Sequence, residues 1–214
     1  YTTLFRSYAL YNLTQEQLKR TLMPVGGYAK EEIRGIAEKI GLPVADKPDS
    51  QDICFVPDGD YASFIEDVAE RQSGQKLPRG SFVTRDGRIL GQHKGIIHYT
   101  VGQRKGLGLA LGYPAFVLEI RPDTNEVVIG TYEESLTYTV RAEKMNFMSE
   151  ADLPEPRSVF AKIRYNHKGA RCTVRRDGED AVVCQFEEPQ RAVTPGQALV
   201  LYDGEYVLGG GTIV

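Results

Sequence analysis

Long apolar runs are missing from this chain of 214 residues. The longest stretch without a charged residue, Gly106 to Leu118, is rich in glycine. It is far shorter than the ~20 apolar residues that a membrane-spanning helix needs. Tyr1 to Leu10 has neither the hydrophobic length nor the cleavage pattern of a signal peptide. We therefore expect no membrane association and a location in the cytoplasm or in an organelle matrix, and we take the cytoplasm as the prediction.

Cysteine is also scarce, with three residues and no Cys-x-x-Cys pair. This pattern supports neither a disulfide scaffold nor a zinc site, so we expect reduced thiols and no bound metal. Cys172 and Cys184 alternate with apolar residues in strand-like segments, which predicts interior packing. Cys54 instead lies between Ile53 and Phe55, directly after a polar run. A thiol there is either a buried filler or an accessible group with a tuned pKa.

Acidic residues are absent from two segments, although the net charge of the chain is -3. The first runs from Gly87 to Leu118 and the second from Arg157 to Arg176. Both contain clustered lysine, arginine and histidine side chains. A charge run is often only a solvated face, but two of them in an otherwise acidic chain favour a polyanionic partner.

Several motifs follow one another in an order similar to that of the tRNA-specific 2-thiouridylases, and the resemblance extends from about Ser7 to the end of the chain. The motifs are Asp49–Phe55, Gly91–Leu109, Arg164-Tyr165, Ala192–Gln197 and Leu208–Gly211. This resemblance implies tRNA as a partner, a protein that donates persulfide sulfur, and ATP with Mg²⁺ as the cofactor. The family's Ser-Gly-Gly-x-Asp-Ser phosphate loop is absent from this sequence. We therefore expect a partial enzyme that is inactive alone and whose ATP site lies in a preceding region.

The resemblance also implies roles for individual residues. Cys54 corresponds to the cysteine whose persulfide delivers sulfur to C2 of an adenylated wobble uridine. Arg164, Tyr165 and Gln197 correspond to positions that contact tRNA. The family's second catalytic cysteine has no counterpart here, so its position stays open. Tyr1 to Arg6 does not match the family's segment at that point, and we interpret it as a foreign junction.

A glycine-flanked loop carries an amide and two cations, Gln103, Arg104 and Lys105. Such a loop suits a nucleic-acid backbone, and it equally suits an ordered contact between domains. We count all three residues as candidate tRNA contacts and keep both interpretations open.

The periodicity predicts an α+β chain in three parts. Residues 1–57 read as the tail of an α/β PP-loop ATPase domain that carries Cys54, with helices at Gln15–Met23 and Lys30–Ile40. Residues 58–137 read as a helix followed by a small, mainly β domain, whose strands include Ile96–Thr100. Residues 138–214 read as a six-stranded β-barrel that binds tRNA. Within it, Phe160, Lys162 and Arg164 should line one basic face of a strand, with Ala161, Ile163 and Tyr165 on the other.

Three functions compete at this point. The first is ATP-dependent sulfur transfer to tRNA by a monomeric enzyme, with Cys54 as the persulfide carrier. The second is a tRNA-binding β module without catalysis. The third, a cysteine hydrolase, lacks an evident histidine and orienting acid beside the cysteine.

Overall fold

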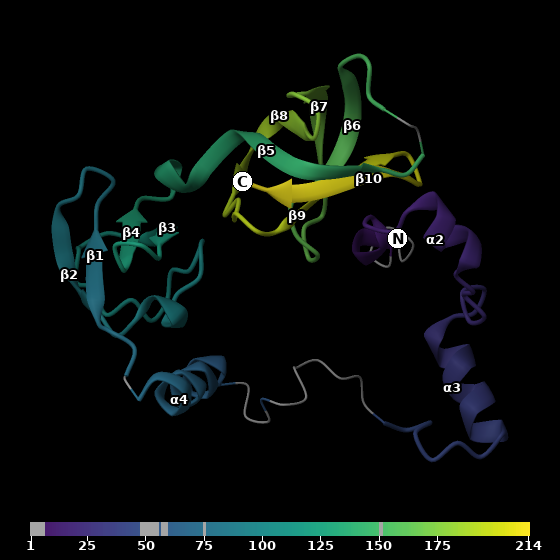
Figure 1. The fold of residues 1–214 in the computed structure, drawn as a ribbon, viewed down its shortest axis with the longest axis horizontal. Helices are drawn as coiled ribbons and strands as arrows, with labels where there is room; N and C mark the ends of the chain where they lie inside the picture. Colours follow the sequence, from purple (N-terminus) through teal and green to yellow (C-terminus); the bar gives the residue numbers. More distant parts are fainter. Residues whose placement is uncertain (1–6, 48–55, 57–59, 75, 150–151) are drawn as a thin grey trace. The chain divides into compact units, whose positions relative to one another are not determined.

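The computed structural model describes residues 7–47, 56, 60–74, 76–149 and 152–214. Contacts divide the chain into two units, Glu16–Lys76 and the remainder, which are described separately. The α-helices and strands of both units are labelled in Figure 1. Domain boundaries at 57 and 137 stay a prediction.

The unit Glu16–Lys76 is helical. Helix α3 spans Lys30–Lys39, and its end is marked by Gly41 with φ +71°. Helix α4 spans Tyr61–Ser73. It begins where an Asp60 carboxylate oxygen accepts a hydrogen bond from Ser63 N at 3.1 Å, and Gly74 follows its end with φ +70°. Local capping therefore explains the C-terminal ends of α3 and α4 and the N-terminal end of α4.

Helix α2 is shorter than the sequence predicts. It spans Gln15–Arg20, whereas the expected helix continued to Met23. The Thr21 hydroxyl donates to Gln17 O at 2.8 Å, and Thr21 N donates to Leu18 O at 3.1 Å. These two contacts close the last turn of the helix.

The central part of the second unit is a four-stranded sheet with the order β2-β1-β4-β3. Its strands are β1 Gly80–Val83, β2 Ile89–His93, β3 Phe116–Arg121 and β4 Glu126–Gly130. Both hairpins are antiparallel, and β1 pairs with β4 in parallel. Side chains from the sheet and from the long β2–β3 connection form one core. Its buried members include Phe82, Tyr99, Leu107, Val117, Val127 and Ile129.

The expected strand at Ile96–Thr100 is wrong. Ile96–His98 forms the 3-10 turn η2, which follows Gly95 at φ 131°. Tyr99 N donates to Ile96 O at 3.1 Å, and the Tyr99 ring packs edge-on against Phe82 with ring centroids 5.1 Å apart. The apolar residues of this segment reach the core from a turn, so their β-branching did not indicate a strand.

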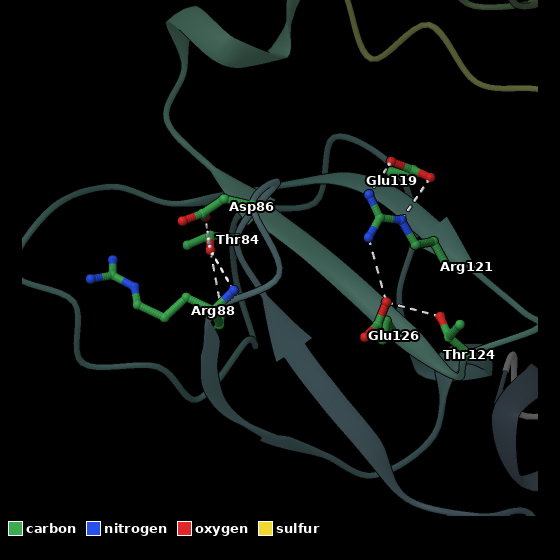
Figure 2. A network of polar contacts seen from close by, with 7 residues as sticks. All are labelled: Thr84, Asp86, Arg88, Glu119, Arg121, Thr124 and Glu126. Carbon is green, nitrogen blue, oxygen red and sulfur yellow. Dashed lines mark hydrogen bonds and ion pairs between the residues drawn. The ribbon is translucent and has the colours of Figure 1, made fainter.

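Local polar contacts hold both hairpin turns of this sheet (Figure 2). Arg121 lies between Glu119 and Glu126, with Nε–Oε1 and Nη1–Oε2 distances of 3.0 and 3.5 Å. At the other turn, the Thr84 hydroxyl donates to the Asp86 carboxylate, which lowers the pKa of Asp86. Figure 2 also shows the Arg88 guanidinium pointing away from this turn.

The C-terminal part is a closed six-stranded barrel with the order β10-β5-β8-β7-β6-β9, as the sequence predicts. Its strands are β5 Leu136–Phe147, β6 Arg157–Lys162, β7 Ala170–Arg176, β8 Ala181–Arg191, β9 Ala198–Asp203 and β10 Tyr206–Ile213. Alternation along β9 places Leu199 and Leu201 in the barrel interior, whereas Val200 and Tyr202 belong to a separate cluster with Tyr8. Cys172 and Cys184 are buried in the interior, which confirms the prediction that they are packing residues.

The segment before α2 packs on the outside of this barrel. The 3-10 turn η1, Tyr8–Leu10, places the Tyr8 hydroxyl 2.7 Å from Ala198 O, to which it donates. Asn146 Nδ2 donates to Tyr11 O at 2.7 Å and to Leu13 O at 3.0 Å. A cluster of Tyr8, Val200 and Tyr202 is thereby closed off from solvent. The outer wall of the barrel is therefore aromatic and buried at this point.

Candidate nucleic-acid interface

Cys54 lies outside the described residues, as do its neighbours from 48 to 55. Its predicted role therefore stays a prediction. The other candidate residues are described, and they occupy the central sheet and the barrel.

Arg164 and Tyr165 lie in the bend after β6 and not within the strand. Because β6 ends at Lys162, the expected two-face alternation does not continue to Arg164 and Tyr165. Ile163 remains inside the barrel core, but Tyr165 is half exposed and contacts Tyr8 edge-on, with ring centroids 6.0 Å apart. Placing Tyr165 on the same face as Ile163 was therefore wrong.

Lys162 is buried, contrary to the expectation that it lines an open basic face. Its side chain is 3% exposed, and its Nζ lies 5.5 Å from the Tyr8 ring centroid and 5.9 Å from that of Tyr165. Burial lowers the pKa of Lys162. Burial, with Tyr11 and Tyr202 adding to it, raises the pKa of Tyr8 to about 12. The aromatic rings thus shield this cation from water, and the loss of hydration outweighs the attraction between the ammonium group and the rings.

His167 follows in the same bend. Its backbone N donates to Arg164 O at 3.0 Å, while its Nδ1 is buried without a hydrogen-bond partner among the described residues. Burial lowers the pKa of His167, and the nearby positive charges of Arg164 and Lys162 lower it further. His167 is therefore neutral over a wider pH range than an exposed histidine.

The Gln103 side chain is engaged within its own loop. Its Nε2 donates to Lys105 O at 2.9 Å, and its Oε1 accepts from Thr100 N at 3.0 Å. Arg104 and Lys105 are exposed on the turn that this amide closes. The amide of Gln103 is thus used to shape the loop, and the two cations are the groups that the loop presents.

The same loop contacts the segment Ala192–Gln197 of the barrel. Gly102 has φ +86°, and a Cβ built on it would lie 2.5 Å from the Cβ of Ala192. Ala192 itself has φ 55°, a conformation that non-glycine residues rarely adopt. The exposed Gln197 follows a turn in which its N donates to Thr194 O at 3.1 Å. Only glycine fits at position 102, so the loop is fixed against the barrel.

Arg164 completes this arrangement. Its Nη1 donates to Arg191 O at 3.2 Å and approaches Ala192 O at 3.4 Å. The Arg191 guanidinium lies 5.8 Å from the Phe116 ring centroid and 5.9 Å from that of Tyr132. Three segments that are far apart in the sequence therefore meet at Ala192. Arg104, Lys105, Tyr165 and Gln197 remain exposed around these segments.

Sequence reasoning missed Tyr8 as part of this region, and it misjudged Lys162. A tyrosine near the chain start carries no local signal that it will cover a strand at Ala198–Asp203. In the described part of the chain, no group of three or more His, Cys, Asp or Glu side chains is placed to hold a metal ion. No helix among those residues is long and apolar enough to cross a membrane.

Three family models match successive parts of the chain. A tRNA methyl transferase HUP domain matches residues 4–58, and a tRNA methyl transferase PRC-barrel domain matches residues 66–131. An aminomethyltransferase β-barrel domain matches residues 137–213. Together with the closed barrel, these matches confirm the predicted α+β class, with a HUP-domain tail, a middle domain and a terminal barrel.

Curated relatives match almost all of the chain. A tRNA-specific 2-thiouridylase MnmA of Lachnoclostridium phytofermentans is 61% identical over 98% of this chain and 57% of its own length. Proteins of the same name from Carboxydothermus hydrogenoformans and Koribacter versatilis are 51% and 50% identical over 97% of this chain and 56% of their lengths. The chain thus spans a little over half the length of these relatives. Over that shared span, it belongs to the tRNA-specific 2-thiouridylase family.

Proposed function

We propose that this chain contributes the sulfur-carrying cysteine and most of the RNA-binding surface to an enzyme that converts the wobble uridine of tRNA to 2-thiouridine. The observation that carries the proposal is the meeting of three segments at Ala192, where Gly102 and Arg164 fix the loops that present Arg104, Lys105, Tyr165 and Gln197. Exposed cations suit the RNA backbone, and an exposed tyrosine suits stacking on an unpaired base. The identity to 2-thiouridylases supports the assignment of the substrate.

In this proposal, Cys54 carries a persulfide. Its terminal sulfur attacks C2 of the uridine, and the bond between C2 and the activated oxygen breaks. The sulfur–sulfur bond to Cys54 must then be cleaved by a second thiol, which leaves a disulfide between the two cysteines. Cys172 and Cys184 are enclosed in the barrel interior and do not fit that role. The second thiol therefore belongs to a part of the enzyme outside this chain.

The residues of this chain do not fit ATP, because no glycine-rich phosphate loop occurs in the sequence. We assign the binding of the nucleotide, with Mg²⁺, to the remaining part of a longer enzyme. The chain alone should accordingly bind tRNA without modifying it. A protein that donates persulfide sulfur to Cys54 is the second partner that this chemistry requires, and we propose that the enzyme acts as a monomer in the cytoplasm.

The test is sulfur incorporation into tRNA from a radiolabelled persulfide donor, with Cys54→Ser in the full-length enzyme. We expect the variant to bind tRNA normally and to transfer no sulfur, because a serine hydroxyl cannot hold a sulfane sulfur. Transfer at a rate comparable to that of the unchanged enzyme would refute the persulfide role. The chain would then be a tRNA-binding β module without catalysis of its own.

A further inference from the structure

A cavity of about 470 Å³ opens on the outside of the barrel, away from the barrel interior. It is bordered by strands β6, β7 and β9, by the β6–β7 connection and by the β9–β10 turn. This volume is within the range of sites that hold small ligands. The side chains that determine its chemistry are Phe160, Lys162, Lys168, Arg171, Tyr202 and Asp203.

The floor of the cavity is a row of paired residues across three strands. Phe160 on β6 is paired with Arg171 on β7 and with Tyr202 on β9. Directly paired residues point to the same face of a sheet, so the three side chains lie next to one another. Tyr202 is buried, whereas Phe160 is 44% exposed. The Arg171 guanidinium carbon lies 5.8 Å from the Phe160 ring centroid. An accessible aromatic ring therefore lies beside a cation.

The β6–β7 connection passes close to this ring. A Cβ built on Gly169 would lie 3.1 Å from Phe160 Cδ1, and Gly169 has φ +88°. The exposed Lys168 precedes it and lines the cavity. The connection therefore passes against one side of the ring and brings Lys168 into the same cavity.

The cavity carries more positive than negative charge. The exposed Lys168 and Arg171 line it together with one carboxylate, Asp203, whose oxygen lies 3.6 Å from a guanidinium nitrogen of Arg157, and the buried Lys162 borders it from below the surface. A site for a small inorganic anion has no need of an exposed phenylalanine. A site for an apolar peptide has no need of an exposed lysine and an exposed arginine. An aromatic platform beside lysine and arginine matches a nucleotide, which has a flat base and a phosphate.

We propose that this cavity binds one unpaired nucleotide of an RNA strand, with the base stacked on Phe160 and a phosphate held by Lys168 and Arg171. The choice of RNA as the source rests on the proposed function, whereas the match to a nucleotide rests on the cavity alone. The site is distinct from the loops that meet at Ala192, because none of the residues that meet there lines it.

The test measures binding of a fluorescently labelled single-stranded RNA tetranucleotide to the complete chain by anisotropy. Phe160→Leu should weaken binding about tenfold, since loss of one stacking contact has an effect of this order. Phe160→Trp should retain binding because it keeps an aromatic face. Arg171→Gln should weaken binding, whereas Arg175→Gln, at an exposed position on the same strand that does not line the cavity, is the matched control.

Equal effects of Arg171→Gln and Arg175→Gln, or unchanged binding by Phe160→Leu, would overturn the proposal. Competition by inorganic phosphate or by polyglutamate as effective as competition by a mononucleotide would also overturn it. Binding of complete tRNA is measured in parallel. If tRNA binds the unchanged chain and these variants equally well, the cavity proposal fails and the proposed function stands. If the tetranucleotide binds in the cavity and tRNA does not bind, the cavity stands and the proposed function fails.

Discussion

Burial alters the acid–base behaviour of several single side chains on the barrel. Lys162 lies beneath the rings of Tyr8 and Tyr165, and its pKa is lowered by loss of water. His167 is affected in the same direction, with Arg164 contributing to the shift. Each group favours its neutral form more in the folded protein than in the unfolded chain, which makes stability depend on pH.

His167→Gln should reduce the loss of stability in mild acid. Because the pKa of His167 is lower in the folded protein, the unfolded chain takes up the proton first as the pH falls. The free energy of unfolding is therefore highest above the pKa of histidine in the unfolded chain, about 6.5. It decreases as the pH falls from there towards the lower pKa of His167 in the folded protein. The measurement is the urea midpoint at about pH 7.5 and about pH 5.5 for both proteins.

The matched control is Asn166→Gln, at an exposed position of the same bend, which removes no titratable group. It should leave the decrease between the two pH values close to that of the unchanged protein. If stability decreases equally in the His167→Gln variant and in the unchanged protein, the half-buried imidazole of His167 contributes nothing to the pH dependence and the prediction is wrong.

The two interior cysteines should be chemically inert in the folded protein. Contact with Cys172, together with burial, raises the pKa of Cys184 far above its usual value, so the reactive thiolate is scarce. Iodoacetamide at about pH 8 should therefore leave both residues unlabelled until urea unfolds the barrel. Cys184→Ser should destabilise the barrel by about 1–3 kcal/mol because it places a hydroxyl in an apolar core. Rapid labelling of either residue in the native protein would show that the barrel opens readily.

Loops decide how the central sheet meets the barrel. Gly102 and Gly108 belong to the same connection between β2 and β3, and both have positive φ, at +86° and +69°. They differ in what surrounds them. A Cβ at position 102 would overlap with Ala192, whereas a Cβ at position 108 would meet no atom within 4 Å. Alanine substitutions at the two positions can therefore be compared to separate the free-energy cost of backbone strain from the cost of steric overlap.

Gly108→Ala should lower the free energy of unfolding by about 1–2 kcal/mol through backbone strain alone. Gly102→Ala should cost that amount plus about 1–3 kcal/mol, because the Ala192 contact must be displaced. Urea denaturation of both variants measures the difference. Equal destabilisation would mean that the loop does not pack on Ala192. We also expect Gly102→Ala to weaken tRNA binding more than Gly108→Ala does, since it shifts the loop that carries Arg104 and Lys105.

The distribution of charge over the chain is uneven, with a net charge of -3 and two segments free of acidic residues. Part of the basic surface in these segments is not available to a partner, because Lys162 is buried and Arg164 donates to backbone carbonyls. Arg104 and Lys105 are exposed and are the better candidates for direct phosphate contacts.

Lys105→Gln and Arg104→Gln should each weaken tRNA binding and lower the slope of log K against log salt by about one. Arg71→Gln, on an exposed position of α4, is the control and should change neither quantity. Titrations with fluorescent tRNA at several salt concentrations give both values. If all three variants behave alike, binding is a diffuse property of the surface and the loop at Gln103–Lys105 has no special part in it.

Local sequence patterns determined a large share of this architecture. The ends of α3 and α4 follow from Gly41, Asp60 and Gly74, because capping depends on residues within one turn of the helix end. The barrel strands follow from alternation and from turns such as Asp177-Gly178, which depend on neighbouring residues in the same way. The resemblance to the family likewise depended on contiguous motifs.

Only the tertiary structure decided what these motifs contact. Ile96–His98 is a turn because Tyr99 packs on Phe82, and Lys162 is buried because Tyr8 covers the strand from a position far away in the chain. The contact of Gly102 and Arg164 with Ala192 joins three distant segments. No local pattern encodes such contacts, because they arise only when the chain closes the barrel and the apolar and polar groups of remote segments compete for the same space.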